Sequence, residues 1–140
     1  MNDQFDLFTH PYTILEHHLD TFGHVNNATY LQILEEARWE FITARGFGMK
    51  KIKETGLGPT ILECNIKFMK ELCLRQNIVI ETQTQSYDRK IGLLKQVMKN
   101  EDGEVCAEAI FTIGLFDTRE RKLVLPTPEW LYAVGAPVAL

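Results

Sequence analysis

The 140-residue chain has few cysteines, no surplus of positive charge and no long apolar run, and each absence excludes a class of protein. No apolar run approaches the ~20 residues that a membrane-spanning helix needs. The net charge of −4 argues against a general nucleic-acid-binding protein, because such proteins usually present a basic face. The acidic start MNDQFDLFTH lacks the basic-then-apolar pattern of a secretion signal. We therefore expect a cytoplasmic protein that has neither a nucleic acid nor a membrane as partner.

Patterns of metal ligands are also missing. The three cysteines are an odd number with no metal-ligand spacing, and each lies in a predicted strand away from any histidine. We therefore expect reduced, buried structural thiols. Three of the four histidines have only Glu16 at ligand spacing, so we expect surface or strand residues rather than metal ligands. The sequence thus predicts no metal and no redox cofactor. The residues concerned are Cys64, Cys73, Cys106, His10, His17 and His18.

The order of predicted elements is one strand, one long helix and four further strands. This order indicates an α+β fold in a single domain over residues 1–140, with no repeat and no linker. A Gly- and Lys-rich connection carries a short helical turn over 49–54. The other expected segments are a strand within 5–18, a loop over 19–26, a helix over about 27–45, strands over 60–70, 77–87, 91–99 and 104–117, and a surface tail over about 118–140.

The predicted long helix carries one apolar stripe at helical spacing. Asn26 or Asn27 is its natural N-cap, because an Asn side chain can accept from the unpaired amides of a first turn. Gly46 is its natural stop. The stripe consists of Tyr30, Ile33, Leu34, Ala37, Phe41 and Ala44.

Asp20 and His24 lie in the polar loop just before this helix. Free N–H groups and the helix dipole make a helix N-terminus a place where negative charge is stabilised. Such an end can hold an oxyanion while Asp20 attacks, or deprotonates a water. The alternative interpretation is that Asp20 and the asparagines only turn and cap the chain.

The stretch DTFGHVNNATYL over residues 20–31, followed by EEAR over 35–38, resembles the signature of the hotdog-fold thioesterases. The resemblance is to the 4-hydroxybenzoyl-CoA thioesterase-like family, and within it to the long-chain acyl-CoA thioesterase branch. It implies an antiparallel five-stranded sheet wrapped around one long helix, and two subunits that pair edge to edge with active sites at their interface. Such dimers often pair again into tetramers.

The resemblance also implies roles for residues of the loop. Asp20 would be the nucleophile or the general base, and backbone amides around Val25, Asn26 and Asn27 would hold the thioester oxygen. His24 could orient Asp20, donate to that oxygen or protonate the leaving thiolate. Tyr30 belongs to the positioning set, or only to the core-facing stripe.

Further residues follow from a second likeness and from the substrate's charge. The plant acyl-ACP thioesterases share the HVNN core, but Phe22 departs from the Asn of their motif. Their strand glutamate resembles Glu71, which is therefore a second candidate carboxylate or a solvated strand end. Coenzyme A carries phosphates, for which Arg89 and Lys90 at a strand turn are candidates, with Lys67 and Lys70 as alternatives.

The predicted function is hydrolysis of fatty or aromatic acyl-CoA thioesters in fatty acid metabolism, with coenzyme A as part of the substrate and no separate cofactor. One alternative is an acyl-ACP thioesterase, which would favour a basic docking patch. Another is a non-catalytic hotdog module that binds acyl-CoA or acts as a sensor, although binding alone does not require Asp20. A hotdog hydratase is disfavoured because the GHVNN loop does not resemble that family.

Overall fold

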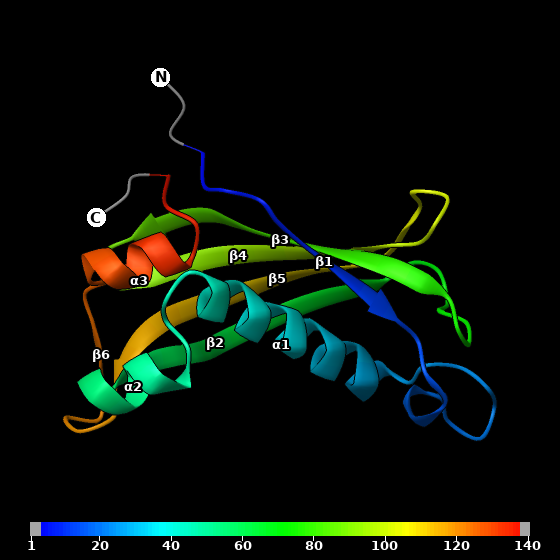
Figure 1. The fold of residues 1–140 in the computed structure, drawn as a ribbon, viewed down its shortest axis with the longest axis horizontal. Helices are drawn as coiled ribbons and strands as arrows, with labels where there is room; N and C mark the ends of the chain where they lie inside the picture. Colours follow the sequence, from blue (N-terminus) through cyan, green and yellow to red (C-terminus); the bar gives the residue numbers. More distant parts are fainter. Residues whose placement is uncertain (1–3, 138–140) are drawn as a thin grey trace.

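One antiparallel sheet covers one long helix in the computed structural model, which describes residues 4–137 (Figure 1). The six strands are β1 (Phe8–Thr13), β2 (Leu57–Phe68), β3 (Asn77–Asp88), β4 (Ile91–Lys99), β5 (Val105–Asp117) and β6 (Lys122–Val124). The helices are α1 (Asn27–Ala44), α2 (Met49–Thr55) and α3 (Pro128–Ala133), with a short 3-10 turn, η1 (Glu16–His18). The strand order is β1-β3-β4-β5-β2, and β6 pairs with the end of β5. The predicted α+β hotdog fold is thus confirmed.

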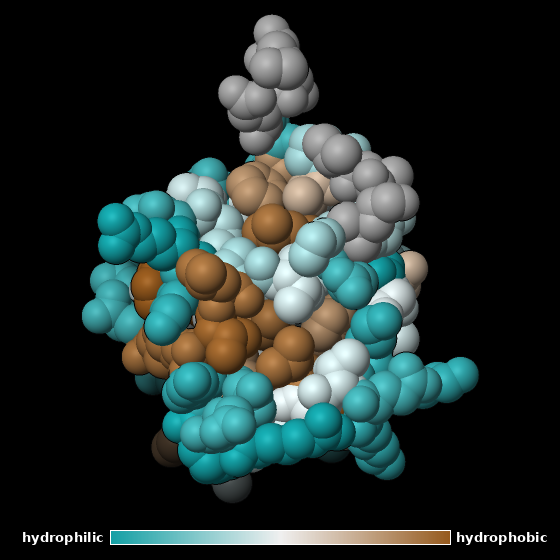
Figure 2. Space-filling view, turned by 90° about the vertical axis from the view of Figure 1, so that its left-hand side faces the viewer, coloured by the Kyte–Doolittle hydropathy of each residue, from teal (hydrophilic) through white to brown (hydrophobic). Residues whose placement is uncertain are grey.

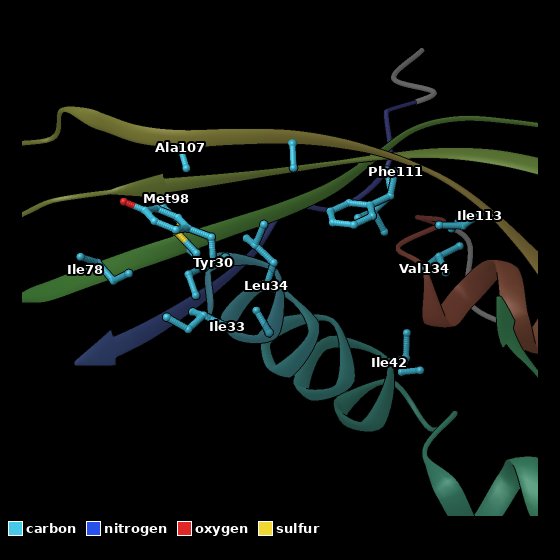
Figure 3. Close-up of a cluster of buried hydrophobic side chains, with 14 of the residues drawn as sticks. Tyr30, Ile33, Leu34, Ile42, Ile78, Met98, Ala107, Phe111, Ile113 and Val134 are labelled. Carbon is cyan, nitrogen blue, oxygen red and sulfur yellow. The ribbon is translucent and has the colours of Figure 1, made fainter. Parts of the chain in front are cut away.

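The core lies between α1 and the inner face of the sheet (Figure 3). Helix α1 buries five of the six predicted stripe residues, while Ala44 is exposed and Ile42 is buried instead. The reason is that α1 ends at Ala44, so its last turn does not reach the core. Asn26 is the N-cap, because its side chain accepts from the Thr29 amide, and Asn27 is the first helical residue.

The chain after β5 differs from the predicted surface tail. Strand β6 makes a sixth strand where five were expected, and it pairs with Leu115–Asp117 of β5. Helix α3 begins with a Thr127 cap and Pro128 at its first position, and it packs the buried Trp130 against Phe47 with ring centroids 5.2 Å apart. These residues are folded because they cover the end of the core beyond the last turn of α1.

Three residues differ in burial from the sequence-based expectation. Cys64 and Cys73 are exposed, and only Cys106 is buried. Cys64 is exposed because β2 is the edge strand of the sheet, and Cys73 because it lies in the connection after β2. His18 is only 5% exposed rather than on the surface, because η1 turns its ring toward β1 and α1.

Strand β2 leaves one long edge of the sheet unpaired among the described residues. Its apolar side chains remain accessible, with Ile61, Leu62 and Phe68 each exposed by more than 40%. An accessible apolar edge of 12 residues is an unusual feature of a monomer, because edge strands invite pairing with another chain. Within residues 4–137, no helix combines the length and the apolar character needed to cross a bilayer.

Candidate active site

The loop between η1 and α1 is a small closed hairpin. Leu19 and Val25 pair as an isolated bridge, and the Asp20 amide donates to the His24 carbonyl at 2.9 Å. Gly23 closes the turn at φ +80°, a conformation that favours glycine. The Oδ1 atom of Asp20 accepts from the amides of Phe22 at 2.9 Å and His24 at 3.3 Å. The carboxylate is therefore held by its own loop through one oxygen.

The N-terminus of α1 follows this loop directly. The Oδ1 atom of Asn26 accepts from the Thr29 amide at 3.0 Å and from the Thr29 hydroxyl at 3.1 Å. The amides of Asn27 and Ala28 precede the first residue that can find an intrahelical acceptor. These two N–H groups are thus available to a negatively charged oxygen at the start of α1.

His24 pairs with Glu71 rather than with Asp20. Its Nδ1 atom lies 2.5 Å from Glu71 Oε2, and both side chains are about half exposed, at 52% and 59%. A carboxylate only accepts, so His24 carries a proton on Nδ1, and in the neutral imidazole Nε2 is then the accepting nitrogen. The two residues come from segments 47 positions apart in the chain, and the sequence did not predict this contact.

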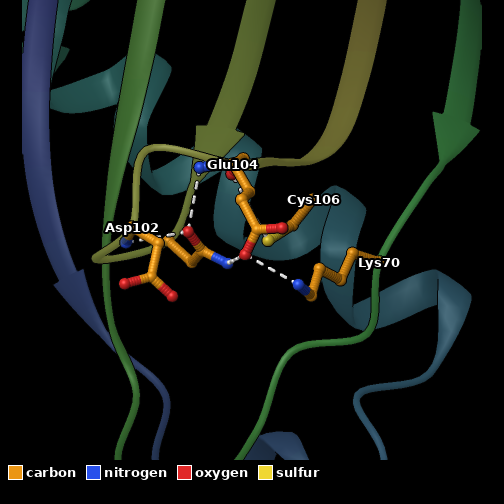
Figure 4. Close-up of polar contacts among 5 residues, drawn as sticks. Lys70, Asp102, Glu104 and Cys106 are labelled. Atoms are coloured by element: carbon orange, nitrogen blue, oxygen red, sulfur yellow. Dashed lines mark hydrogen bonds and ion pairs between the residues drawn. The ribbon is translucent and has the colours of Figure 1, made fainter.

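The segment that carries Glu71 is fastened to the turn between β4 and β5 (Figure 4). The amides of Met69 and Lys70 donate to the Cys106 carbonyl, and Lys70 Nζ lies 2.7 Å from Glu104 Oε1. This contact lowers the pKa of the Glu104 carboxyl and raises the pKa of the Lys70 ammonium. Asn100 donates to the same Glu104 oxygen. Contacts with β5 and with the β4–β5 turn therefore fix the position of the Glu71 backbone.

An open depression of about 290 Å³ at the N-terminal end of α1 is lined by His24, Asn27 and Glu71, whereas the predicted site residues Asp20 and Asn26 are not among its lining residues. Phe68, Met69 and Lys70 complete its wall. Tyr30 is 4% exposed, packs edge to face on Phe68 and has a pKa raised mainly by burial, so it forms the apolar floor. The predicted site residues that line the depression are His24, Val25, Asn27, Tyr30 and Glu71.

Arg89 and Lys90 lie at the other end of the sheet. They line a groove at the β3–β4 hairpin together with exposed Ile91, Leu93 and Leu125. Figure 2 views the molecule from this end and shows apolar side chains gathered among charged ones. Gly92 pairs with Ile113 and Phe68 with Ala107. Those β5 positions are six residues apart. The separation is therefore about 20 Å along β5 at ~3.3 Å per residue.

A second, more enclosed cavity of about 100 Å³ lies between α1 and the sheet. Arg38 enters it, and its guanidinium stacks on Phe111 and donates to Gln96 Oε1 at 3.0 Å. Burial lowers the pKa of Arg38. Apolar side chains from α1, β2 and α3 form most of the wall, among them Trp39, Ile42, Ile61, Trp130 and Val134.

Sequence reasoning missed one polar cluster beside the loop, in which His18 contacts Tyr12 and Tyr12 contacts Glu36. Tyr12 and Glu36 are 24 residues apart, and no local pattern marks the pair. Among residues 4–137, no group of three or more His, Cys, Asp or Glu side chains is arranged to hold a metal ion.

Comparisons with known proteins identify the family of the chain. The thioesterase-like superfamily matches residues 15–134. The long-chain acyl-CoA thioesterase FadM of Escherichia coli is 33% identical over 107 residues, which are 76% of this chain and 80% of FadM. The chain is also 27% identical over 115 residues, 81% of its length, to 61% of the chloroplastic acyl-acyl carrier protein thioesterase ATL2 of Arabidopsis thaliana.

Solved structures show the same fold. The probable thioesterase YbaW of Escherichia coli superposes with a TM-score of 0.80 at 28% identity, covering 94% of this chain and 98% of that one. A Staphylococcus aureus protein solved in complex with CoA superposes with a TM-score of 0.86 at 19% identity, covering 98% and 90% of the two chains. The chain therefore belongs to the thioesterase-like superfamily and is a thioester-hydrolysing enzyme of the hotdog fold.

Proposed function

We propose that the chain hydrolyses acyl-CoA thioesters to a free acid and CoA at the start of α1. The observation that carries this proposal is the depression at the start of α1, where the His24–Glu71 pair and Asn27 share the lining. The Asp20 carboxylate does not line the depression but belongs to the same loop, where it accepts from the His24 amide. The names of FadM and of the CoA-bound Staphylococcus aureus protein support a CoA ester as the substrate class.

The amides of Asn27 and Ala28 hold the thioester oxygen in this mechanism. When the carbonyl carbon is attacked, its oxygen gains a full negative charge, and donors fixed in advance stabilise that charge. The positive end of the α1 dipole acts in the same direction. Asn26 keeps these amides in place because its side chain accepts from the amide of Thr29, the residue that follows them.

Asp20 acts either as the general base or as the nucleophile. As the base it takes a proton from the attacking water, and the tetrahedral intermediate then expels the CoA thiolate. As the nucleophile it forms a mixed anhydride, which water cleaves in a second step. Both routes require the ionised carboxylate, which only accepts hydrogen bonds, and the Oδ1 atom of Asp20 accepts from two amides of its loop.

His24 returns a proton to the leaving sulfur. Glu71 holds the imidazole by Nδ1, so Nε2 is the atom that faces reaction chemistry. In the general-base route, the proton that Asp20 takes from the water passes to Nε2 and from there to the thiolate. In the nucleophile route, the thiolate leaves before water attacks and takes its proton from solvent. Because a thiol has a pKa of ~8.5, this step assists the reaction but is not essential to it. Glu71 orients His24, and this role is more specific than that of a second, independent catalytic carboxylate.

The acyl chain runs from the depression along α1 toward the enclosed cavity. Tyr30 and Ile42 are 12 helical positions apart, or about 18 Å at ~1.5 Å per residue. An extended acyl chain advances ~1.2 Å per bond, so this distance corresponds to about 15 bonds. The chain-length panel described below measures which acyl groups the enzyme accepts.

The proposed active enzyme is a dimer formed through the β2 edge. When two β2 strands pair antiparallel, the end of the partner's sheet that carries its β3–β4 hairpin lies beside the depression of this chain. The cationic hairpin with Arg89 and Lys90 then lies toward the depression of the other subunit, where CoA phosphates would meet it. The accessible apolar residues of β2 support this arrangement.

The test is thiol release from a panel of acyl-CoAs, short to long and one aromatic, by the native protein and by Asp20→Asn. We expect a chain-length optimum and a loss of ~10²-fold or more in the variant, the scale of an acid–base group. Glu40→Gln is the matched control, because it removes a carboxylate from an exposed position in the second half of α1 that lines neither the depression nor the enclosed cavity, and it should keep native rates.

The outcomes separate the alternatives. Equal rates for the native protein and Asp20→Asn would exclude Asp20 from the mechanism and leave His24 and Glu71 as the reacting groups. Release from acyl-ACP but from no CoA ester would favour the carrier-protein alternative, which the likeness to ATL2 keeps open. Binding of acyl-CoA without release from either carrier would indicate a binding module.

A further inference from the structure

Three side chains from three elements meet beside the loop that carries Asp20. Tyr12 comes from β1, His18 from η1 and Glu36 from α1. The Tyr12 hydroxyl oxygen lies 3.0 Å from His18 Nε2 and 2.6 Å from Glu36 Oε2. The two rings are 5.5 Å apart between centroids. The described contacts give this cluster no part in the reaction set out above.

The positions of the protons follow from the partners. The Leu15 amide donates to His18 Nδ1 at 2.8 Å, so Nδ1 must be the accepting nitrogen. A neutral imidazole then carries its proton on Nε2 and donates it to the Tyr12 oxygen. Tyr12 in turn donates to Glu36, whose carboxylate only accepts. The three groups form one directed chain of hydrogen bonds, and bonds in such chains strengthen one another.

This chain of hydrogen bonds fastens the N-terminal end of the active-site loop. His18 is two residues before Asp20, and Leu19 begins the hairpin that closes at Val25. The other end of the loop is fastened by Asn26 at the start of α1. Glu36 belongs to the same helix, ten residues further along. Both ends of the loop are thus fixed to α1, which also supplies the oxyanion amides.

We infer that Tyr12 and His18 are positioning residues, which hold the Asp20 carboxylate at a fixed place relative to the first-turn amides of α1 by tying the loop to Glu36. The inference rests on the proposed thioesterase function. Misplacing a catalytic group by 1 Å can cost about 10²-fold in rate, so a loop fastened at one end only would react slowly.

The ionisation of His18 tests the direction of this chain of hydrogen bonds. A second proton would have to lie on Nδ1, where it would face the Leu15 N–H group. The titratable groups around His18 are His17 on the same turn, Tyr12 and His10 on β1, and Glu36 on α1. Burial and the neighbouring His17 lower the pKa of His18. Burial and Glu36 raise the pKa of Tyr12, so its hydroxyl keeps its proton at every working pH.

The experiment compares Tyr12→Phe, His18→Asn and the double variant in steady-state thioesterase kinetics. Tyr12→Phe removes only the hydroxyl. His18→Asn keeps an acceptor for the Leu15 amide but loses the donor to Tyr12. We expect kcat to fall about 10- to 100-fold in each single variant with KM for the acyl-CoA little changed. The double variant should be no slower than the slower single one, because both changes break one chain.

Tyr132→Phe is the matched control, because it removes a hydroxyl from α3 with no contact to the loop, and its kcat should equal that of the native protein. Circular dichroism at the assay temperature shows that each variant is folded. Full kcat in Tyr12→Phe, or losses that multiply in the double variant, would overturn the inference while leaving the thioesterase intact. A native protein that releases no thiol from any ester would instead overturn the proposed function.

Discussion

At the scale of single residues, His18 should make the stability of the fold depend on pH. Its pKa is lowered in the folded state, whereas the unfolded chain has the usual value of ~6.5. The unfolded state therefore binds more protons as the pH falls through that range, so stability is full above ~6.5 and declines as the pH falls toward the folded-state pKa. Urea unfolding at pH 8 and pH 5 should show this fall in the native protein and a smaller one in His18→Asn.

His10→Asn is the control for this titration, because it removes an imidazole from the neighbouring strand without touching the Leu15 amide. It should keep the native pH dependence. An unchanged fall in His18→Asn would mean that other groups control acid stability.

Single residues also show where sequence reasoning succeeds and where it fails. Asp20 and His24 could be placed beside a helix start from the sequence, since both residues precede the first residue of α1 by only a few positions. The burial of His18 and the pairing of His24 with Glu71 could not, because both depend on residues that only the folded sheet and helix bring close. Tertiary contacts of this kind leave no local pattern.

At the scale of elements, the cap of α1 can be tested directly. Asn26→Ala removes the acceptor for the Thr29 amide and hydroxyl, which should lower the free energy of unfolding by about 1 kcal/mol. Asn27→Ala is the matched control, because Asn27 is the first helical residue and its side chain makes no recorded hydrogen bond among the described residues. Its stability in urea should change by less than ~0.5 kcal/mol. Equal losses in the two variants would show that the cap is misassigned.

Elements with a strong local pattern were predictable and those without one were not. The apolar stripe of α1 and the alternation of β4 predicted the bounds of these two elements to within one residue. Each pattern depends only on residues that are close together in the sequence. Helix α3 is six residues long and starts with Pro128, so its sequence is also typical of a turn. Only the docking of Trp130 against Phe47 makes it a helix of the fold.

At the scale of the whole molecule, the strand order decides which surface is left for a partner. The sequence predicted a strand over 60–70, and the resemblance added edge-to-edge pairing of two subunits. Neither told which strand is the edge, because that depends on long-range pairing: β5 pairs on one side with β4 and on the other with β2. The sheet order makes β2 the edge and leaves Leu62 46% exposed there.

The proposed dimer therefore has a decisive variant, Leu62→Lys. A lysine on an edge strand opposes pairing with another chain, because two copies would bring like charges together. We expect light scattering to give at least twice the 16.1 kDa chain mass for the native protein and the single mass for the variant. Thioesterase activity should fall with the dimer, because the site needs the partner's cationic hairpin. Val79→Lys is the matched control, since Val79 is 39% exposed but lies on β3, inside the sheet. A monomeric native protein with full activity would refute the interface site.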